Sequence, residues 1–267
     1  MKWWVLSTQD FYTKVAEYTR RVDPSWDEEW LWCQDGEYET LKRILGEGSG
    51  RSVLDCSCGE GRQAIPLAKL GWQVAASDLT EACLVTARQH AQQEGLQIDF
   101  RRCDMRDLGQ RFGPSFDWVV SCMALDNIVE DQGIRRAVQG MYDVLKPSGR
   151  CYIRLRNFDS IMSDRPRYEF KEERRLPHGR VIRMEDWDYE SETHVVHIYV
   201  FMLEDERKKE TTWSHGWDYT VFAHRRRALR QAELKQFLSE AGFQEIEFLP
   251  RPDTYDPPHE VVASKGS

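Results

Sequence analysis

Long apolar runs are missing from this sequence, and their absence excludes one broad class of proteins. The 267 residues contain no uninterrupted apolar stretch as long as the roughly 18 residues that a membrane-spanning helix needs. The segment 1–6 is too short, and too soon followed by polar residues, to be a signal peptide. We therefore expect a cytoplasmic protein that has no membrane partner.

The cysteines lack the spacing of a disulfide framework or of a zinc site. Their number is odd, seven, and they are scattered through predicted strands and turns. That usage is typical of a reducing compartment. Cys56 and Cys58 stand two residues apart, and no second Cys/His pair follows at the spacing of zinc ligands. We therefore expect no metal.

An excess of positive charge is also missing, which argues against a nucleic-acid partner. The chain holds 37 Lys and Arg against 45 Asp and Glu, a formal net charge of -8. Proteins that bind a phosphate backbone usually present a basic face. What the sequence does have is 40% hydrophobic and 12% aromatic residues, enough for a sizeable core in one large domain or in a domain with an insert.

Short apolar runs alternate with helix-like segments from residue 51 onward. Residues 8–46, before them, are helix-like and rich in aromatic side chains. Strands that alternate with helices of about ten to fifteen residues predict βαβ units and a parallel sheet. The predicted strands are 51–55, 72–78, 98–102, 116–122 and 150–155, and the predicted helices are 62–70, 81–94 and 131–145.

The pattern changes in residues 167–225, where strand-like runs follow one another without helices between them. Polar and apolar residues alternate in these runs, which predicts an antiparallel insert over the carboxyl edge of the sheet. The predicted strands of the insert are 180–189, 194–203 and 211–222. A helix at 231–241 and strands at 244–249 and 260–263 would then complete a seven-stranded sheet.

The strongest functional signal is the segment 53–61, an apolar strand that ends in an acid and runs into Gly-x-Gly. In an open α/β sheet, ligands bind beyond the carboxyl ends of the strands. Gly59 and Gly61 would let the backbone approach a ligand closely. Asp55, before the glycines, would repel a pyrophosphate but would suit a cationic group. The segment therefore favours a cationic nucleoside over a nicotinamide dinucleotide.

Two further acids follow the next two strands. Asp78 ends the second strand, 17 residues after Gly61, and can accept hydrogen bonds from both hydroxyls of a ribose. Asp104 follows the third strand beside Met105 and could accept a hydrogen bond from the exocyclic amine of adenine. A nucleoside that carries a sulfonium and an ammonium fits Asp55, Asp78 and Asp104 better than NAD does.

These three sites resemble the first three motifs of class I S-adenosylmethionine-dependent methyltransferases. Pro147–Gly149, before the fifth strand, is also similar to that class. Further segments resemble the glycine and glycine/sarcosine N-methyltransferases and their bacterial relatives: Phe11–Tyr12, Arg156–Asp159, Trp187–Tyr189 and Arg225–Arg230. The resemblance implies transfer of a methyl group to the nitrogen of a small amine or amino acid.

The resemblance also implies a fold and a cofactor. We expect an α/β protein, a Rossmann-like seven-stranded mostly parallel sheet with an antiparallel β cap inserted after strand 5. The cofactor would be S-adenosylmethionine and the product S-adenosylhomocysteine. The expected parts are a helical aromatic lid at 1–46, a methyltransferase core at 47–158 and 228–267, and a cap that forms the acceptor subdomain at 159–227.

The expected cofactor-binding residues come from the motifs and from the aromatic lid, whose rings could cover the sulfonium by cation–π contact. They are Tyr18, Trp26, Asp55, Cys58, Gly59, Gly61, Asp78, Leu79, Asp104, Met105 and Cys122. Relatives often place an arginine in the N-terminal helix for the cofactor carboxylate, but 30–34 contains none. Gln34 and Arg62 are the alternatives for that role.

The acceptor is expected between the fourth strand and the cap. We predict Tyr12, Asp126 and Asn127 as catalytic, since an extra carboxylate after strand 4 would suit a cationic acceptor. The predicted substrate-binding residues are Arg156, Asn157, Tyr189 and His197. Each has a structural alternative: helix capping for Asp126 and Asn127, a salt bridge for Arg156, turn chemistry for Asn157, and a solvated or core position for His197. We expect the arginine run 225–227 to be solvated.

Other functions remain open alongside N-methylation. The same fold and cofactor could serve an O- or S-methyltransferase of a small metabolite, or a non-catalytic S-adenosylmethionine-binding protein. An NAD-type oxidoreductase is disfavoured by Asp55 and by the lack of Tyr-x-x-x-Lys after strand 4. The Asn/Asp-Pro-Pro-Tyr/Phe run of nucleic-acid amino-methyltransferases is absent there too. The sequence leaves the acceptor open, and a homo-oligomer could form by pairing at an edge of the cap.

Overall fold

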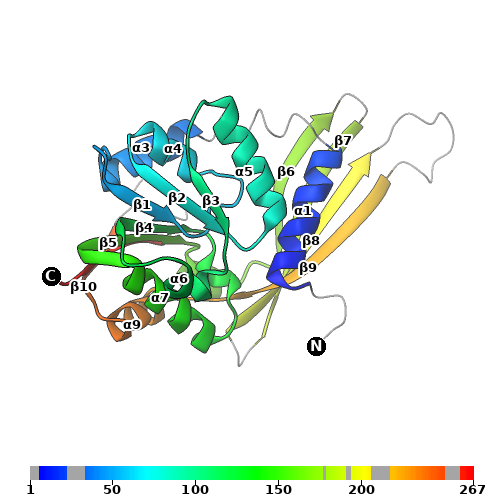
Figure 1. Cartoon of the computed structure of the whole chain (residues 1–267). Helices are drawn as coiled ribbons and strands as arrows, with labels where there is room; N and C mark the ends of the chain where they lie inside the picture. The colour runs from blue at the N-terminus through cyan, green and yellow to red at the C-terminus, as the bar shows by residue number, and fades with distance from the viewer. Residues whose placement is uncertain (1–5, 23–33, 177–178, 191–193, 206–216, 250–258) are drawn as a thin grey trace.

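The computed structural model describes residues 6–22, 34–176, 179–190, 194–205, 217–249 and 259–267. Two sheets dominate these residues, one of seven strands and one of four (Figure 1). The seven-stranded sheet has the order β10-β11-β5-β4-β1-β2-β3, and the four-stranded sheet has the order β6-β7-β8-β9. The expected fold class is confirmed.

The strands β1 to β5 of the large sheet are parallel, and the last two strands pair with β5 antiparallel. They are β1 (Ser52–Asp55), β2 (Gln73–Asp78), β3 (Asp99–Arg102), β4 (Phe116–Cys122), β5 (Leu145–Leu155), β10 (Phe243–Leu249) and β11 (His259–Lys265). The carboxyl ends of β1, β2 and β4 therefore lie along one edge of the sheet. That shared edge brings the motif residues together.

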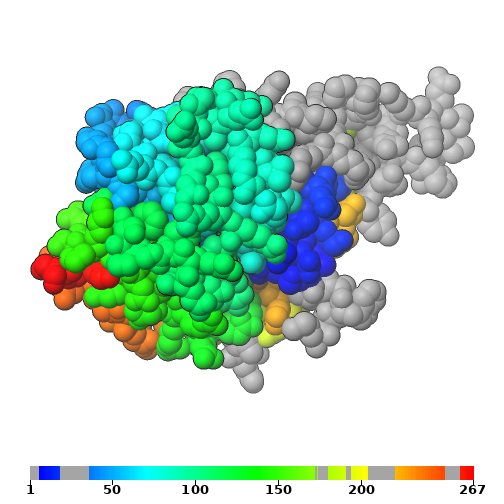
Figure 2. All heavy atoms as spheres, viewed as in Figure 1, coloured from blue at the N-terminus to red at the C-terminus, as the bar shows by residue number. Residues whose placement is uncertain are grey.

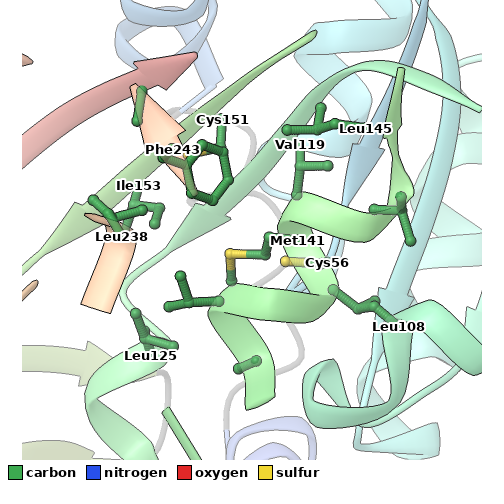
Figure 3. Packing of buried hydrophobic residues seen from close by; sticks show 14 of the residues in the cluster. Cys56, Leu108, Val119, Leu125, Met141, Leu145, Cys151, Ile153, Leu238 and Phe243 are labelled. Atoms are coloured by element: carbon green, nitrogen blue, oxygen red, sulfur yellow. The ribbon is translucent and has the colours of Figure 1, made fainter. Parts of the chain in front are cut away.

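Helices cover both faces of this sheet, so its central strands are apolar on both sides. On one face, α3 (Gln34–Leu45), α4 (Ala64–Lys69) and α5 (Glu81–Gln93) pack with Val53. On the other face, α6 (Leu108–Arg111), α7 (Asp131–Val144) and α9 (Gln231–Glu240) pack with Leu54 (Figure 1). Figure 3 shows Val119, Met141 and Phe243 in this second cluster. Burial on both faces fixes the strand ends that carry the site.

The four-stranded sheet is an antiparallel meander. Its strands are β6 (Tyr168–Leu176), β7 (Gly179–Tyr189), β8 (Val195–Asp205) and β9 (Trp217–Arg227), and α8 (Phe158–Asp164) connects it to β5. β6 and α8 were not predicted, and β9 extends beyond the expected 211–222, whose first residues lie outside the described chain. The expectation that 225–227 is solvated is wrong, because Arg226 and Arg227 are buried in β9.

Helix α1 (Thr8–Val22) packs on the four-stranded sheet beside α5. Figure 1 shows it in front of β8 and β9, with α5 beside it, and Figure 2 shows its surface next to α5. Phe11 and Tyr18 pack with Trp187 and Phe222 of the cap. The ring of Phe11 stacks on His224 with centroids 3.8 Å apart and planes at 13°. Apolar burial thus fixes α1 on the cap.

The described residues contain no helix that is long and apolar enough to cross a membrane. They also contain no group of three or more His, Cys, Asp or Glu side chains placed to hold a metal ion. Their cysteines are all free and buried: Cys56, Cys58, Cys83, Cys103, Cys122 and Cys151. Cys33 lies outside the described residues.

Candidate functional site

The glycine loop after β1 folds tightly over the edge of the sheet. Cys58 N donates to Ser77 O at 3.0 Å, and Gly61 N donates to Cys58 O at 2.8 Å. Gly59 and Gly61 have φ of +51° and +95°, the left-handed region that favours glycine. A Cβ on Gly59 would meet no atom within 4 Å. The loop therefore presents open backbone on that side, as close approach of a ligand requires.

Asp55 is a fully buried carboxylate at the end of β1. Its Oδ1 accepts a hydrogen bond from Ser57 N at 3.3 Å, and its Oδ2 has no hydrogen-bond partner. Burial, together with the nearby charges of Asp78 and Glu37, raises the pKa of Asp55 to about 7 against the opposing hydrogen bond from Ser57. A buried acceptor without a donor is costly unless a ligand completes it. A positively charged group of a ligand would complete this position.

Asp78 fastens the glycine loop to the end of β2. Its Oδ2 accepts from Gly59 N at 2.9 Å, and its Oδ1 accepts from Thr80 N at 2.8 Å. Burial raises the pKa of Asp78, and these backbone donors oppose the shift. Each oxygen keeps a second lone pair, so the carboxylate can also accept hydrogen bonds from the hydroxyls of a ribose. Leu79 follows at the same edge and is partly buried.

Asp104 is more occupied than expected. Its side chain accepts from Arg106 N at 2.9 Å and from the Arg106 guanidinium at 2.6 Å. Burial opposes ionisation of Asp104, but the hydrogen bonds from Arg106 outweigh burial and lower its pKa. Asp104 thereby caps the short helix η1 (Met105–Asp107). An adenine amine at Asp104 would share the carboxylate with Arg106.

Cys58 and Cys122 line the same edge as buried thiols. Burial raises the pKa of both well above the ordinary value, so both stay protonated and serve as small apolar walls. Cys122 N donates to Ser57 Oγ at 3.3 Å, which joins the end of β4 to the glycine loop. The next residue, Met123, has φ +57°. This strained turn directs the chain toward the cap.

Asp126 lies in the short helix η2 (Leu125–Asn127), which follows β4, and is fully buried. Its Oδ2 accepts from Arg156 Nη1 at 2.7 Å and from Arg226 Nη1 at 3.0 Å, while Oδ1 has no partner. Burial opposes the charge of Asp126, but the two arginines hold its pKa below the ordinary value. Asp126 makes no capping hydrogen bond in η2. It joins the large sheet to the cap.

Tyr12 and Asn127 complete this junction. The Tyr12 hydroxyl donates to Asn127 Oδ1 at 3.3 Å and accepts from Arg226 Nη2 at 3.2 Å. Thr8 Oγ1 donates to the Asn127 carbonyl at 3.2 Å. The three predicted catalytic residues Tyr12, Asp126 and Asn127 are thus brought together, with Arg226 between them.

The other predicted site residues lie outside the junction formed by Tyr12, Asp126 and Asn127. Tyr18 packs on Phe222 with ring centroids 5.9 Å apart, and Trp26 lies outside the described residues. Asn157 caps α8 by accepting from Ser160 N at 3.1 Å, as turn chemistry predicts. Met105 packs against the core.

Tyr189 and His197 also bond elsewhere. Tyr189 donates to Pro166 O at 2.9 Å, and burial raises its pKa to about 12. His197 pairs with Glu190. Alternation along β8 places His197 on the face opposite the buried Val196, away from α1. The structure therefore does not bring His197 to Asp126.

Buried polar residues that were not predicted surround Arg226. On β9, burial and the charges of Arg226 and Arg156 hold the pKa of His224 well below its ordinary value, so His224 is neutral. On β7, Glu185 accepts from Trp187 Nε1 at 3.1 Å and from an arginine at 3.0 Å. Period-two alternation within β9 could have placed His224 and Arg226 on one face. The contact of Arg226 with Asp126 could not be predicted in this way, because the two residues are 100 positions apart.

Known proteins resemble the core and the whole fold to different extents. Residues 53–149 match the family model described as "Methyltransferase domain". The chain is 34% identical over 111 residues to the ubiquinone biosynthesis O-methyltransferase of Xanthomonas axonopodis pv. citri. The aligned segment covers 42% of this chain and 45% of that protein. The chain thus spans about half the length of the curated relatives it matches.

Solved structures match nearly the whole chain at low identity, which establishes the fold alone. An S-adenosylmethionine-dependent methyltransferase from Clostridium acetobutylicum has a TM-score of 0.68 at 14% identity, covering 96% of this chain and 99% of that one. CalS10, an amino pentose methyltransferase from Micromonospora echinaspora, has a TM-score of 0.65 at 19% identity, covering 97% and 92%.

Residues 53–149 thus match a methyltransferase domain, and the fold of the chain is that of S-adenosylmethionine-dependent methyltransferases. S-adenosylmethionine remains the expected cofactor. The glycine loop and the acids Asp55 and Asp78 described above lie in this domain. The curated relatives do not single out the glycine/sarcosine N-methyltransferases. Membership of that subfamily stays a prediction.

Proposed function

We propose that the protein transfers the methyl group of S-adenosylmethionine to a hydroxyl oxygen of a small molecule held between the large sheet and the cap. In this proposal residues 1–46 form the lid, 47–158 and 228–267 the core, and 159–227 the acceptor subdomain. The motif residues Asp55, Cys58, Gly59, Gly61, Asp78, Leu79, Asp104, Met105 and Cys122 bind the cofactor.

The observation that carries the choice of oxygen is the pairing of Asp126 with two arginines. Asp126 was expected to suit a cationic acceptor, but Arg156 and Arg226 already neutralise it at 2.7 and 3.0 Å. Arg183 and Lys171 balance Glu185 and Glu169, so they leave the surplus positive charge of the two arginines at Asp126 uncompensated. Surplus cations disfavour a protonated amine and stabilise the negative charge that a hydroxyl develops as it loses its proton.

The cofactor supplies a methyl group bound to a positively charged sulfur, so the protein mainly aligns the acceptor. Alignment of this kind contributes roughly 7–11 kcal/mol in well-oriented reactions. Asp126 Oδ1, buried and without a donor, accepts the hydrogen bond of the acceptor hydroxyl and takes its proton as the oxygen bonds to the methyl carbon. The carbon–sulfur bond breaks in the same step, and S-adenosylhomocysteine leaves. Tyr12 and Asn127 hold α1 over the acceptor through their 3.3 Å hydrogen bond. The similarity of residues in the core to a ubiquinone biosynthesis O-methyltransferase supports the choice of oxygen.

Methylation of an amine is the second candidate. The segments Arg156–Asp159 and Trp187–Tyr189 favour it through their resemblance to glycine/sarcosine N-methyltransferases. Of the substrate-binding residues predicted with it, Arg156 alone contacts Asp126, whereas Asn157, Tyr189 and His197 bond elsewhere.

The test is methyl transfer from methyl-labelled S-adenosylmethionine to matched acceptors. Catechol and 3,4-dihydroxybenzoate offer hydroxyls, and glycine and sarcosine offer amines. We expect label on oxygen, located by mass spectrometry, and a loss of at least tenfold in Asp126→Asn. Glu240→Gln, which removes an exposed ion pair with Arg135 on the far side of the core, is the matched control. Label on the amines alone would reject the proposal in favour of the second candidate.

A further inference from the structure

Glu37, in the first turn of α3, is a buried acid that no motif predicted. It is 7% exposed. Its Oε1 accepts from Arg154 Nη2 at 2.6 Å and lies 3.7 Å from Arg62 Nε. Its Oε2 is buried and has no hydrogen-bond partner. One oxygen of Glu37 is therefore fixed by arginines, and the other is unsatisfied.

Asp55 presents the same pattern beside Glu37. The side chain is 0% exposed, and its Oδ2 is likewise buried without a donor. Glu37 Oε1 lies 3.7 Å from the Nε of Arg62, which directly follows the glycine loop that begins after Asp55. The charge of Glu37 accordingly contributes to the raised pKa of Asp55. Two neighbouring carboxylates with unsatisfied buried oxygens are costly in the free protein. A cation placed between them would remove that cost.

The location and the surrounding charge define the cation. Both acids lie where β1, β4 and β5 end, because Arg154 pairs in register with Cys122, the last residue of β4. No metal-binding group occurs in the described part of the chain. Arg62 follows the glycine loop, half-exposed, and adds a positive charge beside the acids. The charges of Glu37 and Asp55 balance those of Arg154 and Arg62, unlike the arginine surplus at Asp126. A site without net charge complements the ammonium and carboxylate of an α-amino acid, and an ammonium has three donors to share.

We propose that Glu37 and Asp55 together bind the α-amino group of the cofactor, and that Arg62 binds the adjacent carboxylate. Arg154 is a positioning residue that holds Glu37. This inference rests on the proposed function only for the identity of the cofactor, and it is independent of the acceptor. Arg62, directly after the glycine loop, would then take the role of the arginine that relatives often place in the N-terminal helix.

The experiment compares two ligands by calorimetric titration, so that no turnover is needed. One ligand is S-adenosylhomocysteine, and the other is its analogue with hydrogen in place of the α-amino group. The variants are Glu37→Gln, Arg62→Gln and the control Glu260→Gln. Glu260 is also buried and paired with an arginine, but its oxygens accept from Tyr152 at 2.7 Å and Arg43 at 3.3 Å. If Glu37→Gln does not fold, Glu37→Asp takes its place.

We expect Glu37→Gln to bind S-adenosylhomocysteine about tenfold or more weakly, as for loss of a charge-assisted hydrogen bond. It should bind the deaminated analogue within about twofold of the wild type, as should Glu260→Gln for both ligands. Arg62→Gln should weaken binding of both, because both keep the carboxylate. Equal weakening of both ligands by Glu37→Gln, or of neither, overturns the inference. Binding that follows these expectations without methylation of any hydroxyl rejects the proposed function alone.

Discussion

Replacing Asp55 by asparagine is expected to stabilise the free protein more at high pH than at low pH. Burial raises the pKa of this carboxyl from 3.8 to about 7. The folded state therefore binds a proton at pH values where the unfolded state has lost it, and the free energy of unfolding falls as pH rises from about 4 to about 7. Asparagine cannot ionise, so the variant lacks this fall.

The magnitude follows from the interval of pH over which the two states differ. Between pH 5 and pH 7, each pH unit costs the wild type about 1.4 kcal/mol, and above pH 7 the cost stays constant. The difference in unfolding free energy between Asp55→Asn and the wild type should therefore grow by about 3 kcal/mol from pH 5 to pH 8. Comparing the two proteins cancels the other titrating groups and the fixed cost of burying the amide.

Urea unfolding at pH 5 and pH 8, followed by circular dichroism, measures this difference. Saturating S-adenosylhomocysteine should reverse the order at pH 8, because its ammonium stabilises the charged Asp55 and adds stability through binding. Calorimetry in buffers of different ionisation enthalpy should also detect release of about half a proton per ligand at pH 7. A difference between variant and wild type that is the same at both pH values would refute the reasoning.

Three further substitutions test the site. Asp78→Asn should weaken binding of S-adenosylhomocysteine at least tenfold in titration calorimetry while the protein stays folded; unchanged affinity would contradict a ribose contact. Arg226→Gln removes one of two arginines from buried Asp126 and should lower the free energy of unfolding by about 3 kcal/mol in urea; a change below about 1 kcal/mol would contradict the buried junction. Tyr12→Phe removes two hydrogen bonds and should cost about 1 kcal/mol and slow methyl transfer, and normal turnover would exclude the hydroxyl from acceptor positioning.

The core could be predicted because its signals are local. β1, β2 and β4 are apolar runs buried on both faces, and each ends in a polar residue or a turn that a short window of sequence contains. The start of β5 could not be predicted, because the residues Lys146–Gly149 are typical of the end of a helix. In the structure these residues lie inside β5, with Ser148 at φ +62° beside a register shift.

Some strands of the cap and the buried residues Arg226 and Glu37 could not be predicted, because the residues they contact are distant in sequence. β6 carries Lys171, Glu173 and other charges that hide a strand. Arg226 appeared solvated within an arginine run, and only Asp126 and Tyr12, supplied by other elements, explain its burial. Glu37 gave no signal for the same reason, since its partners lie on β5 and after the glycine loop. A cytoplasmic location and the formation of a homo-oligomer stay predictions.

The contact between α1 and the cap joins segments that the ribosome makes at very different times. Tyr12 and Arg226, which share a hydrogen bond, are 214 positions apart along the chain. Helix α1 is therefore made long before β9, while β1 to β5 can pair as they emerge from the ribosome. Until β9 is complete, the apolar side of α1, with Phe11 and Tyr18, lacks the part of its docking surface that Phe222 supplies. Nascent chains that stall within the cap should thus expose this helix and depend on chaperones to avoid aggregation.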